Sequence, residues 1–173
     1  QVRVPASRVV PIWKAFERPT AGGPISQFIQ AAIDAGLARG ALDDTLDYVR
    51  RHTRPWIDSG LEKASEDPYI LQQLGDLQVR LRAAEAVLDL AADAIDLALR
   101  EPSEDSVAEA SIRTAEAKVL TTEVAILASN RLFELAGARS TLEEYGLDRH
   151  WRNDRVHTLH DPVRWKYHIL GNY

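Results

Sequence analysis

Three long segments of this chain carry apolar residues at steps of three and four, which is the spacing of one face of an α-helix. They cover residues 24–52, 68–100 and 103–137, and nothing downstream of them supplies partner strands for a sheet. Long helices joined by short connections pack antiparallel. We therefore predict an all-α fold, an antiparallel up-and-down four-helix bundle with an extended N-terminal arm.

Residues at the ends of these segments support the same boundaries. Pro24 and Pro68 suit the first turn of a helix, and Ser103 is a favourable N-cap residue. Arg54 precedes a proline and so ends the first helix, because the residue before proline avoids helical angles. Gly137 is placed to end the third helix.

Each long helix is predicted to bury one apolar stripe. The stripes comprise Ile25, Phe28, Ile29, Ala32, Leu42, Leu46 and Val49 in the first helix, Leu71, Leu74, Leu77, Leu81, Ala84, Leu88, Ala91, Ile95 and Leu99 in the second, and Ile112, Ala115, Val119, Val124, Leu127 and Leu132 in the third. Gly36 and Gly40 interrupt the first helix, where each costs roughly 1 kcal/mol relative to alanine. A close approach of another helix or of a ligand is the expected compensation.

The last part of the chain is predicted to supply the fourth helical layer. We expect a turn of helix at 141–145, a helix at 147–154, a non-helical histidine-rich loop and a final helix from Asp161 to Leu170. Trp151 and Trp165 are expected in the core, because tryptophan is highly buried on average.

Composition excludes several classes of function. The chain has no Cys, which removes disulfides, thiolate catalysis and Cys-ligated zinc. Its net charge of −5 gives no overall basic field for nucleic acid, and no apolar run approaches the ~20 residues that span a bilayer. We expect a cytoplasmic protein that binds neither nucleic acid nor a membrane. Met is absent even at position 1, so we expect a processed or cut N-terminus, or a fragment.

Residues 1–23 differ from the rest of the chain in being rich in Pro, Gly and β-prone pairs such as Val9-Val10. A lone strand is not stable in water. This segment therefore either leaves a β domain that the chain lacks or wraps on the helices as an extended arm.

Side chains suited to chemistry are concentrated in residues 137–161, which hold four Arg, three of the five His and a Trp. His157 and His160 lie three apart beside Asp161, a spacing that two ligands of one metal can have. No HExxH or Glu-xx-His pair accompanies them, so we predict no metal site. A histidine beside a carboxylate suits acid–base chemistry or a hydrogen bond to a cofactor, and otherwise lies in a surface loop.

The arginines of this stretch allow two interpretations. Arginines at helix ends usually form surface ion pairs of little energetic value. Arg139, which follows Gly137 and Ala138, can instead present its planar fork to a phosphate or to a flavin carbonyl.

Six motifs together resemble the C-terminal part of the acyl-CoA dehydrogenase superfamily. They are VPASRVVP (ending at Pro11), AAIDAGLARGALDD (31–44), RPW (54–56), EDPY (66–69), GAR (137–139) and YGLDRHWRNDRVHTLHDPVRWKYH (145–168). Within the superfamily the chain looks most like the flavin-dependent monooxygenase branch, which includes dibenzothiophene monooxygenases and sulfur-acquisition oxidoreductases. The likeness covers nearly the whole chain.

The resemblance implies a parent protein with an N-terminal helical domain, a middle β domain and a C-terminal four-helix bundle. Residues 1–23 are then the exit of the missing middle domain with a linker, and residues 24–173 are the bundle. The implied activity is oxygenation of a small organosulfur compound through a flavin C4a-peroxide. The implied cofactor is reduced FMN from a separate NAD(P)H-dependent reductase, and the implied assembly is a homotetramer formed through the bundles.

The same resemblance implies roles for individual residues. Arg54 of RPW is expected to contact the flavin phosphate, and Ala138 and Arg139 of GAR to contact the flavin. His160 of LHDP is expected to hydrogen-bond to the peroxide or to protonate it, with His157 as the second choice. The chain alone is expected to be inactive, because the remaining flavin and substrate contacts lie in the absent domains.

Two alternatives remain open. One is the C-terminal domain of an acyl-CoA dehydrogenase that uses FAD, since Asp161 falls about where those enzymes keep a glutamate base. Asp is one methylene shorter than Glu, and a displacement of ~1 Å can cost a factor of ~100 in such a reaction, which favours the monooxygenase. The other alternative is a non-catalytic bundle whose role is self-assembly.

Overall fold

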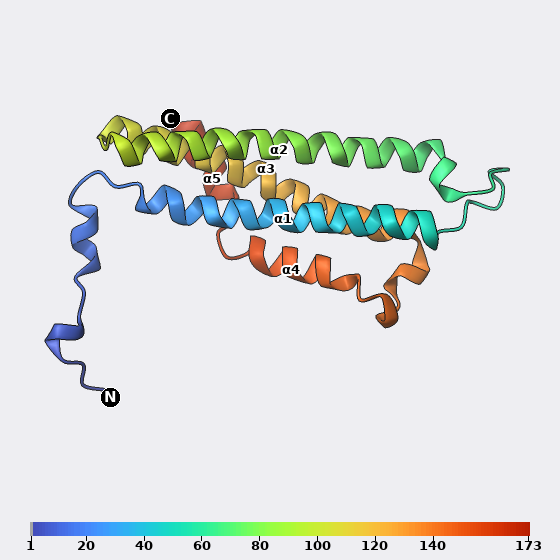
Figure 1. Cartoon of the computed structure of the whole chain (residues 1–173), viewed down its shortest axis with the longest axis horizontal. Helices are drawn as coiled ribbons and strands as arrows, with labels where there is room; N and C mark the ends of the chain where they lie inside the picture. The colour runs from blue at the N-terminus through green and yellow to red at the C-terminus, as the bar shows by residue number, and fades with distance from the viewer. Residues whose placement is uncertain (1) are drawn as a thin grey trace.

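The computed structural model describes residues 2–173. Three long antiparallel helices form the body of the molecule (Figure 1): α1 (Gly22–Arg51), α2 (Pro68–Arg100) and α3 (Glu104–Ala136). Two shorter helices follow, α4 (Asp148–Thr158) against α1 and α3, and α5 (Arg164–Asn172) against α3. The predicted all-α antiparallel bundle is confirmed, and its fourth layer is divided between α4 and α5.

The predicted caps at Ser103 and Gly137 are present, and Asp67 supplies a further cap. The side chain of Asp67 accepts hydrogen bonds from the N–H groups of Tyr69 and Ile70 at the start of α2. Ser103 and Ser106 form a capping box at the start of α3. Gly137 ends α3 with a φ of 84°, a backbone conformation that glycine adopts without a side-chain clash.

The core combines small residues of α1 and α3 with leucines of α2. Its largest cluster includes Ala38, Ala41, Leu42, Val49, Leu74, Leu77, Leu81, Ala84, Val124, Ala125, Ala128, Leu132 and Leu135. The predicted burial is wrong for three residues, since Ile29, Leu71 and Leu99 are 50%, 52% and 57% exposed. At the end of α2 the smaller Ala98 packs with Ala110 in place of Leu99, because a small residue allows the two helices to lie close together.

The tryptophans and the glycine pair also differ from expectation. Trp151 and Trp165 are 41% and 56% exposed, so their assignment to the core is wrong. A Cβ on Gly40 would lie 3.6 Å from Cε1 of His150, whereas nothing lies within 4 Å of such an atom on Gly36. The predicted close approach is therefore found at Gly40 and not at Gly36. The missing side chain at Gly40 lets α4 pack against α1.

The segment after α3 is more helical than predicted. Residues 141–145 form parts of two 3-10 turns, Ala138–Thr141 and Glu143–Tyr145. α4 then continues to Thr158, so His157 lies on a helix and the predicted loop is wrong at this position. Contacts of the inner face of α4 with α1 and α3, described below, favour the extra helical turn.

The N-terminal arm leads away from the bundle at the start of α1 (Figure 1). It contains two 3-10 turns, Ala6–Arg8 and Ile12–Phe16, and most of its described side chains are exposed. Its attachment to a preceding β domain stays a prediction. Within residues 2–173, no helix is both long enough and apolar enough to cross a membrane.

Candidate functional site

The structure divides the predicted flavin-binding residues into two groups. Arg54, Ala138 and Arg139 lie together at the end of the bundle where α1 and α3 both end, and all three are exposed. The hydroxyl of Thr53 donates a hydrogen bond to the carbonyl of Ala136 at 3.1 Å, which holds the loop after α1 against the end of α3. We call these three residues the arginine group.

Three aromatic rings, those of Tyr48, His52 and Tyr145, pack together beside the arginine group. The rings of Tyr48 and Tyr145 meet edge to face at 5.0 Å, and the ring of His52 lies 4.9 Å from that of Tyr48. The hydroxyl of Tyr145 accepts a hydrogen bond from Nη2 of Arg139 at 3.4 Å. These contacts restrict where the Arg139 side chain can lie.

Neither Arg54 nor Arg139 forms an ion pair within residues 2–173. Arg149 and Arg152 differ, since they pair with Asp44 and Asp148 respectively. A guanidinium group without a carboxylate partner can bind a phosphate group with two parallel hydrogen bonds.

The two candidate histidines lie elsewhere, near the middle of the bundle at the end of α4. His160 is exposed, and its backbone N–H donates to the carbonyl of His157 at 3.1 Å. His157 in turn contacts Asp34 of α1. From Asp34 to the end of α1 the helix rises about 25 Å at ~1.5 Å per residue. One chain therefore does not bring the histidines and the arginine group together.

A buried charged network that the sequence interpretation missed lies under α4. Asp34 and Lys118 are both 0% exposed, and Nζ of Lys118 donates to Oδ2 of Asp34 at 2.7 Å. The hydroxyl of Thr122 donates to the same oxygen at 2.7 Å, and Nδ1 of His157 lies 2.5 Å from Oδ1. A buried ion pair needs such additional hydrogen bonds to offset the loss of hydration.

Asp154 of α4 is a second buried carboxyl in this region. It is 0% exposed, and within residues 2–173 neither of its oxygens accepts a hydrogen bond, since the hydroxyl of the adjacent Ser129 donates to the carbonyl of Ile126. Burial raises the pKa of Asp154 to about 7; the nearby Ser129 hydroxyl lowers this pKa, and the charge of Asp34 raises it further. Asp154 therefore titrates near neutral pH.

The inner face of α4 makes polar contacts with α1. At its start Nε2 of His150 lies 2.7 Å from Oδ2 of Asp44, which also binds Arg149. Near its end His157 contacts Asp34, whereas Val156 and Leu159 point outward and are 73% and 66% exposed. The inner face of α4 is thus polar and part of its outer face is apolar.

A sequence signal for the buried network does exist. Asp34 lies three residues after Ala31 and four before Ala38, and both alanines are buried. Lys118 follows Ala115 by three residues in the same way. Charged residues at positions that helical spacing assigns to a buried face indicate a paired charge in the core.

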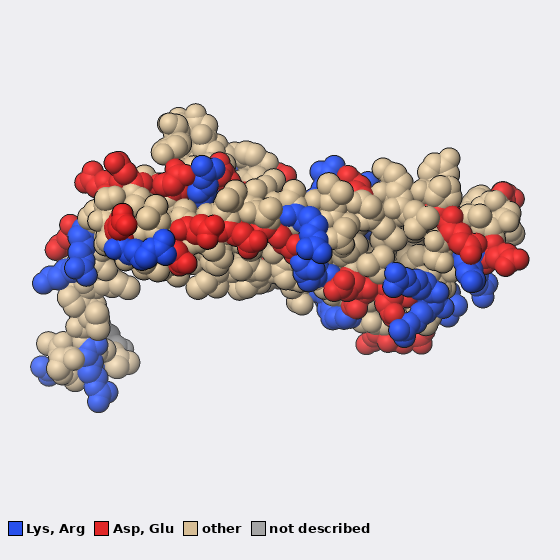
Figure 2. All heavy atoms as spheres, turned by 45° about the horizontal axis from the view of Figure 1, so that its top comes forward, with Lys and Arg blue, Asp and Glu red and all other residues tan. Residues whose placement is uncertain are grey.

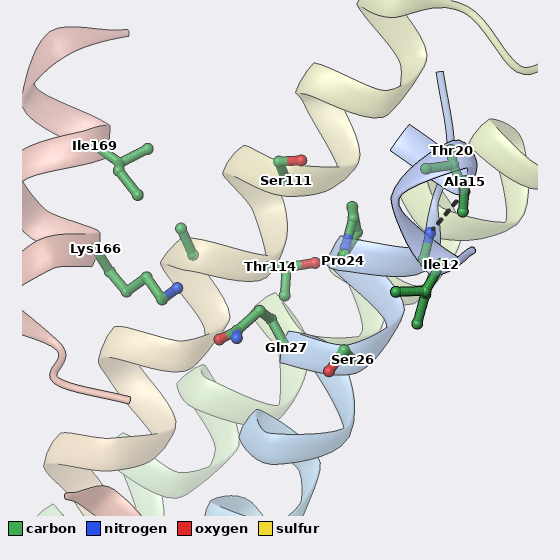
Figure 3. A pocket seen from close by; sticks show the side chains of 13 residues that line it. Ile12, Ala15, Thr20, Pro24, Ser26, Gln27, Ser111, Thr114, Lys166 and Ile169 are labelled. Atoms are coloured by element: carbon green, nitrogen blue, oxygen red, sulfur yellow. Dashed lines mark hydrogen bonds between the residues drawn. The ribbon is translucent and has the colours of Figure 1, made fainter. Parts of the chain in front are cut away.

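A cavity of about 620 Å³ lies between the start of α1, α3 and α5 (Figure 3). Pro24, Ile12 and Ile169 form apolar parts of its wall. Lys166 of α5 reaches into it and pairs with Asp161 at 2.9 Å, which connects the cavity to the residue beside His160.

Two polar groups in the wall of this cavity lack partners. Oγ1 of Thr114 and Oε1 of Gln27 are buried and form no hydrogen bond within residues 2–173. A buried polar atom without a partner is costly. The cavity can therefore take a small, mostly apolar molecule that also carries a hydrogen-bonding group.

Other kinds of site have less support. On the face that Figure 2 shows, Lys and Arg side chains are interspersed with Asp and Glu. Among residues 2–173 no group of three or more His, Asp or Glu is arranged to hold a metal ion.

The sequence is similar to those of several monooxygenases. It is 38% identical over 154 residues to the dibenzothiophene monooxygenase of Mycolicibacterium goodii, in an alignment of 87% of this chain with 37% of that protein. It is 35% identical over 152 residues to SfnC of Pseudomonas putida, a probable FMNH2-dependent monooxygenase, with 86% and 38% covered. The chain thus spans less than two fifths of the length of these relatives.

Solved structures give the same result. FMN-bound TdsC from Paenibacillus sp. A11-2 superposes with a TM-score of 0.81 at 38% identity, over 86% of this chain and 38% of that one. The methanesulfinate monooxygenase MsuC from Pseudomonas fluorescens superposes with a TM-score of 0.83 at 35% identity, over 86% and 40%. The butyryl-CoA dehydrogenase of Megasphaera elsdenii, at 21% identity and a TM-score of 0.67, shares the fold.

The family assignment follows from these similarities and from a family profile. The profile described as "Acyl-CoA dehydrogenase, C-terminal domain" matches residues 28–165, which is most of the chain. The resemblance inferred from the six motifs is confirmed. This chain belongs to the acyl-CoA dehydrogenase C-terminal domain family.

Proposed function

We propose that the chain is the C-terminal bundle domain of a reduced-FMN-dependent monooxygenase that oxygenates a small organosulfur compound, in sulfur metabolism. The observation that carries the proposal is the pair of arginines without ion-pair partners, Arg54 and Arg139, in a chain similar to FMN-bound TdsC. Reduced FMN, when bound, supplies the activation of O₂. A separate NAD(P)H-dependent reductase supplies the reduced flavin.

Each candidate residue has a role in this proposal. Arg54 and Arg139 bind the flavin phosphate, and Ala138 contacts the flavin beside Arg139. His160, whose exposed imidazole is accessible to a bound molecule, holds or transfers a proton near the reacting atoms. His157 is the second candidate for that role.

The proposed assembly is a homotetramer formed through the bundles. The separation of about 25 Å between the arginine group and the histidines is longer than an FMN molecule. The two groups can therefore serve one flavin when they come from different copies of the chain. Exposed apolar residues on α2 and α3, such as Leu90, Leu97 and Leu120, suit contacts between bundles.

The proposed substrate is small and largely apolar, because the cavity beside Lys166 offers about 620 Å³ and most of the surface that lines it is apolar. The remaining walls of the site belong to a preceding middle domain, of which residues 1–23 are the exit. A cytoplasmic location completes the proposal.

The test uses a parent protein that contains this chain. O₂ uptake and oxygenated product are measured with dibenzothiophene and with methanesulfinate, in the presence of reduced FMN or of reduced FAD. We expect product to form when reduced FMN is supplied and not without reduced flavin. Anaerobic reduction of bound FAD by an acyl-CoA would support the dehydrogenase alternative instead.

A further inference from the structure

The buried network assigns a role to Asp34, for which the sequence motifs imply none. We propose that Asp34 is a positioning residue that keeps a proton on Nδ1 of His157, so that Nε2 is the nitrogen that gains and loses a proton. The inference deepens the proposed function and rests on it for the reaction that Nε2 serves. The hydrogen bonds from which the tautomer is inferred do not depend on that function.

The hydrogen-bond pattern of Asp34 fixes where the proton lies. Lys118 and Thr122 both donate to Oδ2 of Asp34, and the ammonium group of Lys118 is fully buried with it. A buried ammonium requires a charged partner, so Asp34 is a carboxylate. A carboxylate only accepts hydrogen bonds, so the hydrogen between Oδ1 and Nδ1 belongs to the His157 ring.

The carboxylate itself is held rigidly. Asp34 lies in the middle of α1, and its two donors lie one turn apart on α3. Both helices continue for several turns on either side of the contact. A ring whose Nδ1–H binds a carboxylate fixed in this way has one orientation and one tautomer, as in other sites where a third group orients a base.

The opposite edge of the His157 ring lines an open groove. The side chain of His157 is 21% exposed, and since Nδ1 faces Asp34, the edge that carries Nε2 faces outward. The groove has a volume of about 540 Å³. Its apolar lining consists of Ile33, Leu37 and Val156, and its polar lining includes Arg149, Arg152 and Asn153. A reacting molecule therefore has space to approach Nε2.

The charged groups around His157 come from three helices. They are Asp34 of α1, Lys118 of α3, and Asp154, Arg149 and Arg152 of α4. His160 differs from His157 in that its ring forms no hydrogen bond within residues 2–173. Of the two candidate histidines, the structure orients His157.

The test is ring ¹⁵N NMR of this 173-residue chain with labelled histidine, from pH 6 to pH 9. We expect Nδ1 of His157 to keep the chemical shift of a protonated nitrogen throughout this range. His160 is the internal control, and we expect its two nitrogens to exchange the proton. Loss of the proton from Nδ1 of His157 would overturn the assignment.

A double variant separates positioning from support of the fold. Asp34→Leu with Lys118→Met removes both buried charges together, so neither is left unpaired, and it also removes the acceptor of the Nδ1–H hydrogen bond. We expect His157 to lose its fixed Nδ1–H tautomer while circular dichroism shows a folded bundle. An unchanged tautomer in the folded double variant contradicts the inference.

Activity of the parent protein adds a second readout. If Nε2 serves the reaction, we expect the double variant to lower kcat about 10- to 100-fold with little change in KM, as for other residues that orient a reacting group. A parent protein without oxygenation activity would contradict the proposed function, whereas the NMR result would still decide the role of Asp34.

Discussion

The carboxylate of Asp34 lies 2.5 Å from Nδ1 of His157, although the two residues are 123 positions apart in the chain. This contact joins the middle of α1 to the last turn of α4. Together with the contact between Asp44 and His150, it holds a helix whose inner face is polar. The position of the candidate histidines thus depends on polar contacts between α4 and α1.

Removal of one member of the Asp34–Lys118 pair should lower the free energy of unfolding strongly, because the other charge stays buried without a partner. Lys118→Met leaves a buried carboxylate without its counter-charge, so we expect a loss of about 3–5 kcal/mol in the free energy of unfolding. The matched control is Arg80→Met, which removes an exposed ion pair with Asp76 and should cost less than about 1 kcal/mol. Urea unfolding of both variants decides, and equal losses would contradict the structure.

Asp154 should make stability depend on pH near neutrality. Its pKa is raised from 3.8 in the unfolded chain to about 7 in the folded protein, because burial disfavours the charged form. The folded state then binds the proton more tightly, so the stability that Asp154 contributes is complete below pH ~4 and is lost as pH rises through about 7.

Asp154→Asn tests this dependence. The variant cannot ionise, so we expect it to gain about 2–4 kcal/mol relative to the wild type on going from pH 4 to pH 8. Denaturant unfolding at both pH values gives this difference, and Asp148→Asn on the exposed side of α4 is the control. A difference between variant and wild type that is the same at both pH values argues against a buried carboxyl with a raised pKa.

The arginine group should bind the phosphate of the cofactor. In the parent protein we expect Arg139→Ala to weaken FMN binding about 10- to 100-fold, because a hydrogen bond to a charged group contributes about 1.5–3 kcal/mol. Riboflavin, which lacks the phosphate, should bind equally to variant and wild type. Arg152→Ala is the control, since Arg152 already pairs with Asp148. Equal loss of riboflavin affinity would assign Arg139 a different role.

Much of the fold could be predicted from the sequence because its signals are local. Apolar spacing gives the three long helices, and Asp67, Ser103 and Gly137 mark their ends through contacts with near neighbours. The cationic stretch at 137–161 also stands out by composition. The separation of the candidate residues into the arginine group and the histidines cannot be predicted from composition. It depends on the direction in which α4 runs along α1.

The buried network shows where local signals end. Asp34 and Lys118 each appear in the sequence as a single charge on an apolar face, and the two residues are 84 positions apart. No spacing rule connects them. The extra turn of α4 has the same origin, since His157 contacts Asp34 of α1, and the exposure of Trp151 and Trp165 likewise depends on which helices pack against them.

In the proposed tetramer, the arginine group of one copy and the histidines of another complete one FMN site. Co-expression of two variants of the parent protein, Arg139→Ala and His160→Ala, tests this arrangement most directly. The mixed oligomers are assayed at a reduced-FMN concentration too low to fill the sites of Arg139→Ala. If the site is shared between copies, random mixing places both intact residues in some sites, and activity returns to on the order of a quarter of the wild-type rate. Mixed oligomers that remain as inactive as each variant alone would contradict the claim.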